Sequence, residues 1–502
     1  MTSSILNDVN NELTPLKELI VVFSPISIVE FLLKRLNHVG NSKSVEEWGN
    51  WTPWDMLLLL KLVIAFDSKS IKPALEKDIM PMMDLIINLT TPANKVFESE
   101  HPNKTSIGFR IMAFQQFWLQ PVSNLFYFDI ARNQMLFNSQ FPQYDFPREF
   151  KTVTGIDFQT FQKIVQILMT WIELRTISED KRNISIKFKG IPEIDVSNFF
   201  KLVSTSFEVC QNEFSNSLQT KKFHLQITER SPLKNKPFLV TQNGAALIYT
   251  KLFVYFAKFG VYDLMKNHQS NAFSRSFGKV MENYIRTRLI QNKYDFLNEN
   301  QIEAIVGKEN KKTDFVVKFD KFNIVIESKG IELGNSAMVD PNPLVLANEL
   351  SGKIIEAMNQ CLYISNRISD GTLDSSLSKK THIFIISYKE LFLGNGIHAW
   401  HEIFENETKV FRKQNNIENV IPSRIHIMDI AEFDLFLIKT KTMSHAQIET
   451  FLDNISALNS VPQTSTLTIS QSIELSSSDF ENEIDLKKEY QNFIEKIRPH
   501  LE

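Results

Sequence analysis

Two acidic residues and a lysine in the middle of the chain have the types and the spacing that phosphodiester chemistry requires. Twelve residues separate Asp314 from Glu327, and Lys329 follows Glu327 by two positions. Side chains alternate between the two faces of a β-strand, so Glu327 and Lys329 share a face if this segment is extended. Paired carboxylates can hold a hard divalent cation such as Mg²⁺. A neighbouring ammonium can position the attacking water, help to deprotonate it, or neutralise developing charge.

The segment that carries these residues has the pattern of a β-hairpin. A two-residue turn at Asp320-Lys321 pairs 319 with 322 and places Asp314 opposite Glu327; a four-residue turn keeps the same parity. Opposite Cβ atoms lie ~4.5–5.5 Å apart, and two carboxylates at about 5 Å repel by roughly 3 kcal/mol at an effective dielectric constant of ~20. We therefore expect a cation between them. The pairing also joins six apolar side chains into one core face: Phe315, Val317, Phe319, Phe322, Ile324 and Ile326.

The spacing of Asp314 and Glu327-Ser328-Lys329 resembles the motif of the PD-(D/E)XK nuclease superfamily, which has the restriction-endonuclease-like fold. Thr313 stands where the family name has proline. In that family a helix with another acidic residue precedes the hairpin. The segment 276–285 resembles this helix, with Glu282 in the place of the acid at the edge of an apolar stripe of helical spacing.

Two later segments extend the resemblance. Family members often follow the hairpin with a helix that bears a glutamine and a tyrosine, and 344–367 resembles it. Gln360 and Tyr363 stand for the pair, with one residue fewer between them than in the exonuclease-like branch. A helix tyrosine can also be an ordinary packing residue. Closing strands are expected at 381–387 and 424–429.

The resemblance implies a nuclease that uses Mg²⁺ or Mn²⁺ and cuts DNA rather than RNA, in restriction or antiviral defence. Lys329 and Gln360 would complete its catalytic set. A ribonuclease on the same fold and a non-catalytic, nuclease-like scaffold in a larger complex are the alternatives. The implied metal ligands are Asp314, Glu327, Glu282 and the carbonyl group of Ile326.

Each of these residues also has a purely structural interpretation. Glu282 could pair with Arg286 on a helix surface, which is worth a few tenths of a kcal/mol. Asp314 could cap a turn or pair with Lys311 or Lys312. The acid and the lysine of the second strand could be exposed charges on an ordinary hairpin, since exposed pairs contribute little.

The basic residues near the hairpin are candidates for contacts with a phosphate backbone. Such contacts give affinity that falls with salt and carries no sequence specificity. Any one of them can equally be a solvated surface charge. The candidates for nucleic-acid binding are Lys311, Lys312, Lys318 and Tyr363.

The composition limits the class of protein. A net charge of −3 excludes a chain coated in positive charge but allows a local basic patch. Two cysteines among 502 residues suit a reducing cytosol, so we expect a cytoplasmic protein. The apolar run 56–66 is far shorter than the ~20 residues that cross a bilayer, so we expect no membrane partner. His398 and His401 have no third zinc ligand nearby, which favours a structural role.

The order of predicted elements indicates an α+β chain of two domains. Residues 1–222 read as a helical domain that senses a signal, recruits a partner or oligomerises. The expected partner is a second copy of the chain, in a homo-oligomer, or another protein of a defence system. Its clearest helix starts at Thr52-Pro53. Residues 223–267 read as a junction with a strand at 238–240 and a helix at 244–265. Residues 268–455 alternate helix and strand, as an α/β nuclease domain does. Residues 456–502 read as a flexible linker, 456–481, and a short last helix.

Overall fold

The computed structural model describes most of the chain, which folds into two compact units. Unit 1 takes in the described residues between 13 and 270 apart from 105–111. Unit 2 takes in 105–111 and the described residues from 271 to 475. None of the helices in these described parts is long and apolar enough to cross a membrane. The residues that are not described are 1–12, 41–48, 101–104, 120–125, 139, 142–143, 174–187, 221–225, 227–228, 243, 269, 341, 416–419, 462–463 and 476–502.

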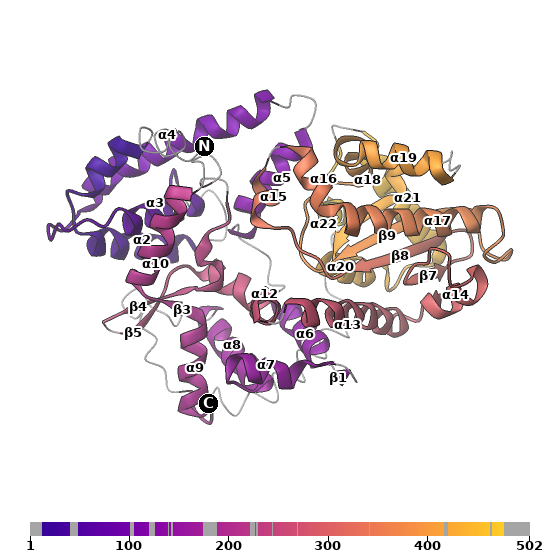
Figure 1. The fold of residues 1–502 in the computed structure, drawn as a ribbon, viewed down its shortest axis with the longest axis horizontal. Helices are drawn as coiled ribbons and strands as arrows, with labels where there is room; N and C mark the ends of the chain where they lie inside the picture. Colours follow the sequence, from indigo (N-terminus) through magenta and orange to yellow (C-terminus); the bar gives the residue numbers. More distant parts are fainter. Residues whose placement is uncertain are drawn as a thin grey trace. The chain divides into compact units, whose positions relative to one another are not determined.

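Unit 1 is mostly helical, as predicted (Figure 1). Residues 13–20 are helical too. Its helices are α2 (Pro25–Gly40), α3 (Pro53–Ala65), α4 (Glu76–Glu100), the second half of α5 (Thr105–Gln116), η2 (Phe117–Leu119), α6 (Phe126–Phe137), α7 (Phe146–Thr154), α8 (Phe158–Glu173), α9 (Glu193–Val203), α10 (Phe207–Thr220), η3 (Pro232–Asn235) and α12 (Thr250–His268). Its strands are β1 (Gln140–Phe141), β2 (Tyr144–Asp145), β3 (Ser204–Thr205), β4 (Phe238–Thr241) and β5 (Gly244–Leu247).

The central helix of unit 1 is α3, and its predicted start is confirmed. The Thr52 hydroxyl caps the helix by accepting a hydrogen bond from the Asp55 backbone N–H, and Pro53 occupies the first helical position. Every residue from Asp55 to Ala65 is buried, including Lys61, because the helix is apolar nearly all round.

The segment 223–267 is part of unit 1 and not a junction between domains. The strand at 238–240 is confirmed as β4, but the helix expected over 244–265 begins only at Thr250. Its first residues form β5, which pairs antiparallel with β4, while β3 pairs parallel with β4. Gly244 has a φ of +113°, which glycine tolerates, and this turn diverts the chain from a helix into a hairpin.

Unit 2 is built on a five-stranded mixed sheet with the order β10-β9-β8-β7-β6. Neighbours β6, β7 and β8 are antiparallel, and β8, β9 and β10 are parallel. The strands are β6 (Asp295–Asn298), β7 (Phe315–Lys318), β8 (Asn323–Lys329), β9 (Thr381–Ser387) and β10 (Ile425–Asp429). The helices are α13 (Ser270–Gln291), α14 (Glu299–Val306), α15 (Asn335–Val339), α16 (Pro343–Leu350), η4 (Ser351–Ile355), α17 (Glu356–Ser369), α18 (Gly396–His398), η5 (Ala399–Ile403), α19 (Glu405–Asn415), η6 (Pro422–Arg424), α20 (Ile430–Thr440), α21 (His445–Asn459) and α22 (Ile469–Leu475).

The predicted hairpin forms with the predicted register. Phe315 pairs with Ile326, and the Phe319 backbone N–H donates to the Phe322 carbonyl across a two-residue turn. Both faces of the hairpin are covered, because Val316 and Val325 on the second face are also fully buried. The sheet is therefore enclosed on two sides, as mixed sheets with parallel strands usually are.

The linker expected over 456–481 is wrong for its described part. The helix α21 continues to Asn459, and α22 follows with Ile473 and Ser472 fully buried. The Ser470 backbone N–H also donates to a carboxylate oxygen of Glu432 on α20 at 3.0 Å. The Ser/Thr-rich composition suggested a flexible segment, but these hydroxyls satisfy one another locally while Ile469 and Ile473 fill the core. The short last helix predicted beyond 481 lies outside the described residues.

Candidate functional site

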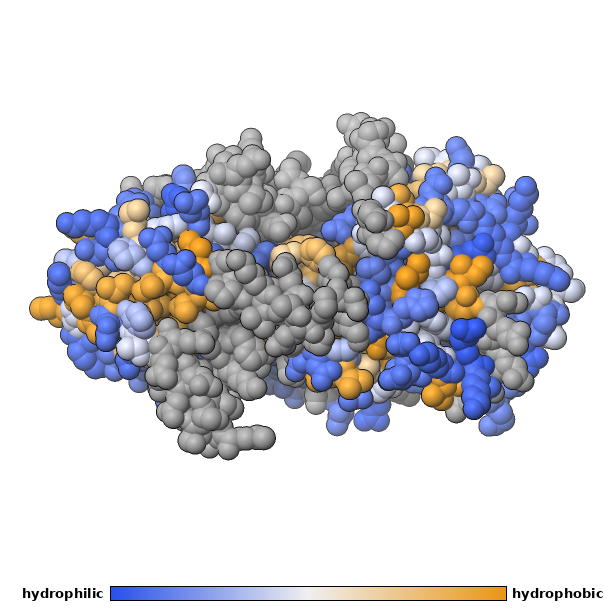
Figure 2. Space-filling view, turned by 90° about the horizontal axis from the view of Figure 1, so that it is seen from above, coloured by the Kyte–Doolittle hydropathy of each residue, from blue (hydrophilic) through white to orange (hydrophobic). Residues whose placement is uncertain are grey.

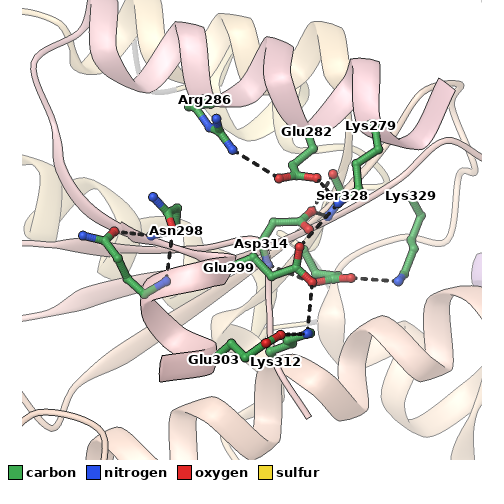
Figure 3. Close-up of polar contacts among 12 residues, drawn as sticks. Lys279, Glu282, Arg286, Asn298, Glu299, Glu303, Lys312, Asp314, Ser328 and Lys329 are labelled. Carbon is green, nitrogen blue, oxygen red and sulfur yellow. Dashed lines mark hydrogen bonds and ion pairs between the residues drawn. The ribbon is translucent and has the colours of Figure 1, made fainter. Parts of the chain in front are cut away.

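The hairpin places the three predicted residues on adjacent strands of unit 2. Asp314 immediately precedes β7, and Glu327 and Lys329 lie in the second half of β8. The apolar positions 315, 317, 324 and 326 fix this placement, since a slip of one residue would turn every one of them to the other face. Figure 3 shows the polar contacts that result.

The two carboxylates are held at the same place by reciprocal hydrogen bonds between the strands. One Glu327 oxygen, Oε2, accepts from the Asp314 backbone N–H at 3.1 Å. The Oδ2 atom of Asp314 accepts from the Ser328 backbone N–H at 2.7 Å and from its hydroxyl at 2.6 Å. Asp314 and Glu327 therefore lie face to face, as the register predicts.

Burial raises the pKa of both carboxyl groups. The pKa of Asp314 rises to about 6 because the group is desolvated; the hydrogen bonds from Ser328 oppose this, and the charge of Glu282 adds to it. The pKa of Glu327 rises to about 8, again chiefly by desolvation and then by repulsion from Asp314, while Lys329 acts against the rise. The neighbourhood is short of positive charge, which is the electrostatic condition for a cation site.

Lys329 is held between β8 and α17. Its ammonium lies 2.7 Å from Glu327 Oε1 and donates to Gln360 Oε1 at 3.2 Å. Burial opposes the charge of Lys329, but the attraction of Glu327 and Asp314 outweighs it, so its pKa is raised. Lys329 therefore stays protonated at neutral pH and is suited to stabilise negative charge rather than to act as a base. Gln360, predicted from the family resemblance, does reach the site.

Glu282 lies on α13 with two cationic partners. Its carboxylate contacts the Lys279 ammonium at 2.7 Å and the Arg286 guanidinium at 3.4 Å. The pair of Glu282 with Arg286 that the structural interpretation expects is present, but Glu282 is buried and not on the helix surface. Its charge nevertheless contributes to the raised pKa of Asp314, so the carboxylate lies close to the site.

The residues predicted to bind nucleic acid make other contacts or lie on the surface. The hydroxyl of Tyr363 donates to Asn310 at 3.1 Å and accepts from Arg367 at 2.9 Å, which makes a separate network. Lys312 forms ion pairs with Glu303 and, at 3.7 Å, with Glu299. Of the other predicted residues, Lys311 is exposed, Lys318 pairs at 4.0 Å with Asp295 at the other end of β7, and the Ile326 side chain is buried in the core.

Two residues of the site were not predicted. Ser328 supplies two donors to Asp314, and strand alternation gave no reason to choose it because it assigns Ser328 to the face opposite Glu327. Lys279 links Glu282 to Glu299 of α14, which it contacts at 3.4 Å. Its position three residues before Glu282 on a helix was the available signal.

Two carboxylates suit Mg²⁺, which keeps several of its waters, better than they suit a metal ion that protein side chains surround completely. Among the described residues, no three histidine, cysteine, aspartate or glutamate side chains come together closely enough to surround an ion. Mg²⁺ characteristically takes one or two carboxylates and keeps several waters, so Asp314 and Glu327 suffice. His398 does not take part, since its Nε2 atom lies 3.0 Å from the Ser465 hydroxyl, and His401 is exposed.

The chain was compared with known proteins in three ways. No family model matches it, and no curated protein or solved structure matches it either. Arguments about its function therefore depend on the residues and the geometry described above.

Proposed function

We propose that unit 2 is a divalent-metal-dependent nuclease of the PD-(D/E)XK type that hydrolyses phosphodiester bonds in DNA. The observation that carries the proposal is the pair of buried carboxylates, Asp314 and Glu327, facing each other across one hairpin beside the ammonium of Lys329. The order of α13, the β7–β8 hairpin, α17 and β9 gives further support, because the resemblance to the superfamily implies a helix, a hairpin, a second helix and a closing strand in this order; β6, α14, α15, α16 and η4 lie between them.

Asp314 and Glu327 would hold Mg²⁺ or Mn²⁺, with the Ile326 carbonyl as a further candidate ligand; Glu282 would join them only by leaving Lys279 and Arg286. The ion would supply a water of lowered pKa and would stabilise charge on a phosphoryl oxygen. The Lys329 ammonium stabilises negative charge that develops on the phosphate, and the Gln360 side-chain oxygen orients that ammonium.

A DNA substrate and a role in restriction or antiviral defence belong to the same proposal and follow from the family resemblance alone, while a cytoplasmic location is proposed from the low number of cysteines. RNA is the competing substrate. A nuclease-like scaffold without activity is the competing role, and the contacts of Glu282 with Lys279 and Arg286 favour it, since they occupy the third acidic group.

The test is a cleavage assay on plasmid, linear duplex DNA, single-stranded DNA and RNA, with Mg²⁺, with Mn²⁺ and with EDTA. We expect DNA cleavage that needs the metal and that falls at least about a hundredfold in Lys329→Met, because a charge-stabilising donor is lost. Lys409→Ala is the matched control, since its ammonium pairs on the exposed surface of α19. Cleavage of RNA alone would change the substrate, and cleavage that survives Asp314→Asn would refute the site.

A further inference from the structure

An exposed apolar patch lies on unit 1 where the loop 21–24, before α2, runs beside the loop 67–75, before α4. Ile71 is 94% exposed, Ile26 62% and Leu75 58%. Figure 2 shows apolar side chains gathered at the left of the view, the end at which Figure 1 labels α2 and α3. The exposed apolar side chains of the two neighbouring segments 21–26 and 71–80 are called the loop patch below: Val21, Val22, Ile26, Ile71, Leu75 and Met80.

The two loops are fastened to each other through side-chain hydrogen bonds. The Ser68 hydroxyl donates to the carbonyl oxygens of Val21 at 3.0 Å and Phe23 at 2.9 Å. The Ser70 hydroxyl donates to the Val22 carbonyl at 2.7 Å. The loop patch is therefore held in place before any partner arrives, which reduces the entropy lost on binding.

The charges around the loop patch are balanced. A surface that binds nucleic acid or an anionic membrane needs more positive than negative charges, and the segment 67–78 has equal numbers of both. A surface that meets a second copy of itself across a two-fold axis needs both signs, because each charge must find its opposite on the same patch. Between 67 and 78 the chain carries three lysines, Lys69, Lys72 and Lys77, and three acids, Asp67, Glu76 and Asp78.

The loop patch has the composition of the centre of a dimer interface, because all six of its side chains are apolar and 39–94% exposed. A stable interface buries about 800 Å² on each partner, with an apolar centre and a polar rim. The loop patch supplies the centre, and the balanced charges of 67–78 supply the rim.

We propose that two copies of this chain associate through the loop patch about a two-fold axis. The inference concerns unit 1 and is independent of the nuclease proposed for unit 2. It assigns to the helical unit an oligomerisation surface centred on Ile71.

The test is the molar mass of the full-length protein by light scattering during size-exclusion chromatography, from about 1 to 100 μM. We expect twice the 58.2 kDa of one chain. The double variant Ile26→Asp, Ile71→Asp should weaken association at least about tenfold, as the loss of central contacts does. The matched control is Ile194→Asp on α9, which is 63% exposed in the same unit and outside the loop patch, and it should remain dimeric.

A monomeric wild type at every concentration would overturn the proposal, as would a double variant that stays dimeric. Binding of a monomeric wild type to phosphatidylcholine–phosphatidylserine vesicles would also overturn it and would assign the loop patch to a lipid surface. A second variant, Ile71→Cys, tests the same surface by chemical cross-linking. The native Cys210 and Cys361 are both buried, so the new thiol at position 71 is the one that a reagent reaches. A bismaleimide should join two Ile71→Cys chains, and failure to do so would count against the proposal.

Discussion

Replacing Glu327 by glutamine should make the metal-free protein more stable while removing its response to metal. Glutamine keeps the shape of the side chain and an oxygen that can accept from the Asp314 backbone N–H, but it removes a buried charge. The pKa of Glu327 is about 8 in the folded protein against an ordinary 4.5. At pH 7 only the part of this difference between pH 4.5 and pH 7 has been lost, because the folded protein still binds the proton, and at 1.36 kcal/mol for each pKa unit that part corresponds to about 3 kcal/mol of folding free energy.

The sign of the pH dependence follows from the raised pKa. Between about pH 4.5 and 8 the folded protein binds a proton at Glu327 that the unfolded chain has released. Wild-type stability therefore falls as the pH rises through this window, and the contribution of Glu327 is most favourable below it. Glu327→Gln has no such group, so its advantage over wild type should grow from pH 5 to pH 8.

Thermal and urea unfolding in EDTA, followed by circular dichroism at pH 5, 7 and 8, measures this effect. With Mn²⁺ at a hundred times its dissociation constant, wild type should gain about 2.7 kcal/mol and Glu327→Gln almost nothing. Glu405→Gln, which removes an exposed carboxylate of α19, is the control and should change neither quantity. A Glu327→Gln protein that is less stable than wild type at every pH would refute the picture of an electrostatically unfavourable site.

Three further predictions concern other charged groups of unit 2. Lys329→Met should lower cleavage at least about a hundredfold but keep Mn²⁺-induced stabilisation, which calorimetry can show. Burial lowers the pKa of His382 to about 2, with repulsion from His426 adding to it, and lowers that of His426 to about 4. The unfolded chain therefore takes up protons below pH 6.5 that the folded protein does not, and stability at pH 5 should fall by about 2 kcal/mol for each histidine. His426→Phe should reduce this acid sensitivity in a pH series of urea unfolding. Finally, Arg288→Leu should cost about 3–5 kcal/mol, because it leaves Asp434 buried without its cation.

Controls separate these effects from general damage. Lys409→Ala breaks an exposed pair and should change stability by less than about 0.5 kcal/mol. A loss of similar size in Arg288→Leu would show that the buried pair contributes no more than a surface one. Unchanged acid sensitivity in His426→Phe would show that the histidine pair of β9 and β10 does not titrate as described.

The sequence predicts four of the five strands of unit 2: apolar alternation marks the hairpin strands β7 and β8, and short apolar runs mark β9 and β10, whereas β6 is not singled out. The segment 381–387 forms β9 with the predicted bounds, and β10 begins one residue after the predicted start at 424. The prediction fails where composition was used in place of periodicity. Residues 456–481 looked like a linker because of their serines and threonines, although Ile469 and Ile473 already had helical spacing. A positive φ at Gly244 likewise cannot be read from a single sequence.

The residues of the candidate site likewise fall into those that local strand pairing places, which were predicted, and those that tertiary packing places, whose contacts no local pattern predicts. Residues placed by the hairpin register, Asp314 and Glu327, meet as predicted because the pairing depends only on local parity. Lys312 was a candidate for a phosphate contact or an ordinary surface charge, and the structure adds an ion pair with Glu303 that the sequence did not indicate. That acid comes from α14, and the position of a helix relative to a loop is set by tertiary packing that no local pattern contains.

Two buried ionic clusters of unit 2 differ in charge balance, and the difference separates packing from function. Asp434 receives the hydroxyl of Tyr284 at 2.8 Å on both oxygens and the guanidinium of Arg288 at 3.1 Å, so one anion meets one cation. At the hairpin, the single ammonium of Lys329 faces two buried carboxylates. A cluster that is neutral within the protein needs nothing more, whereas a cluster with excess negative charge must bind a proton or a metal ion. Of these two clusters, the hairpin cluster is therefore the one whose stability should respond to Mn²⁺.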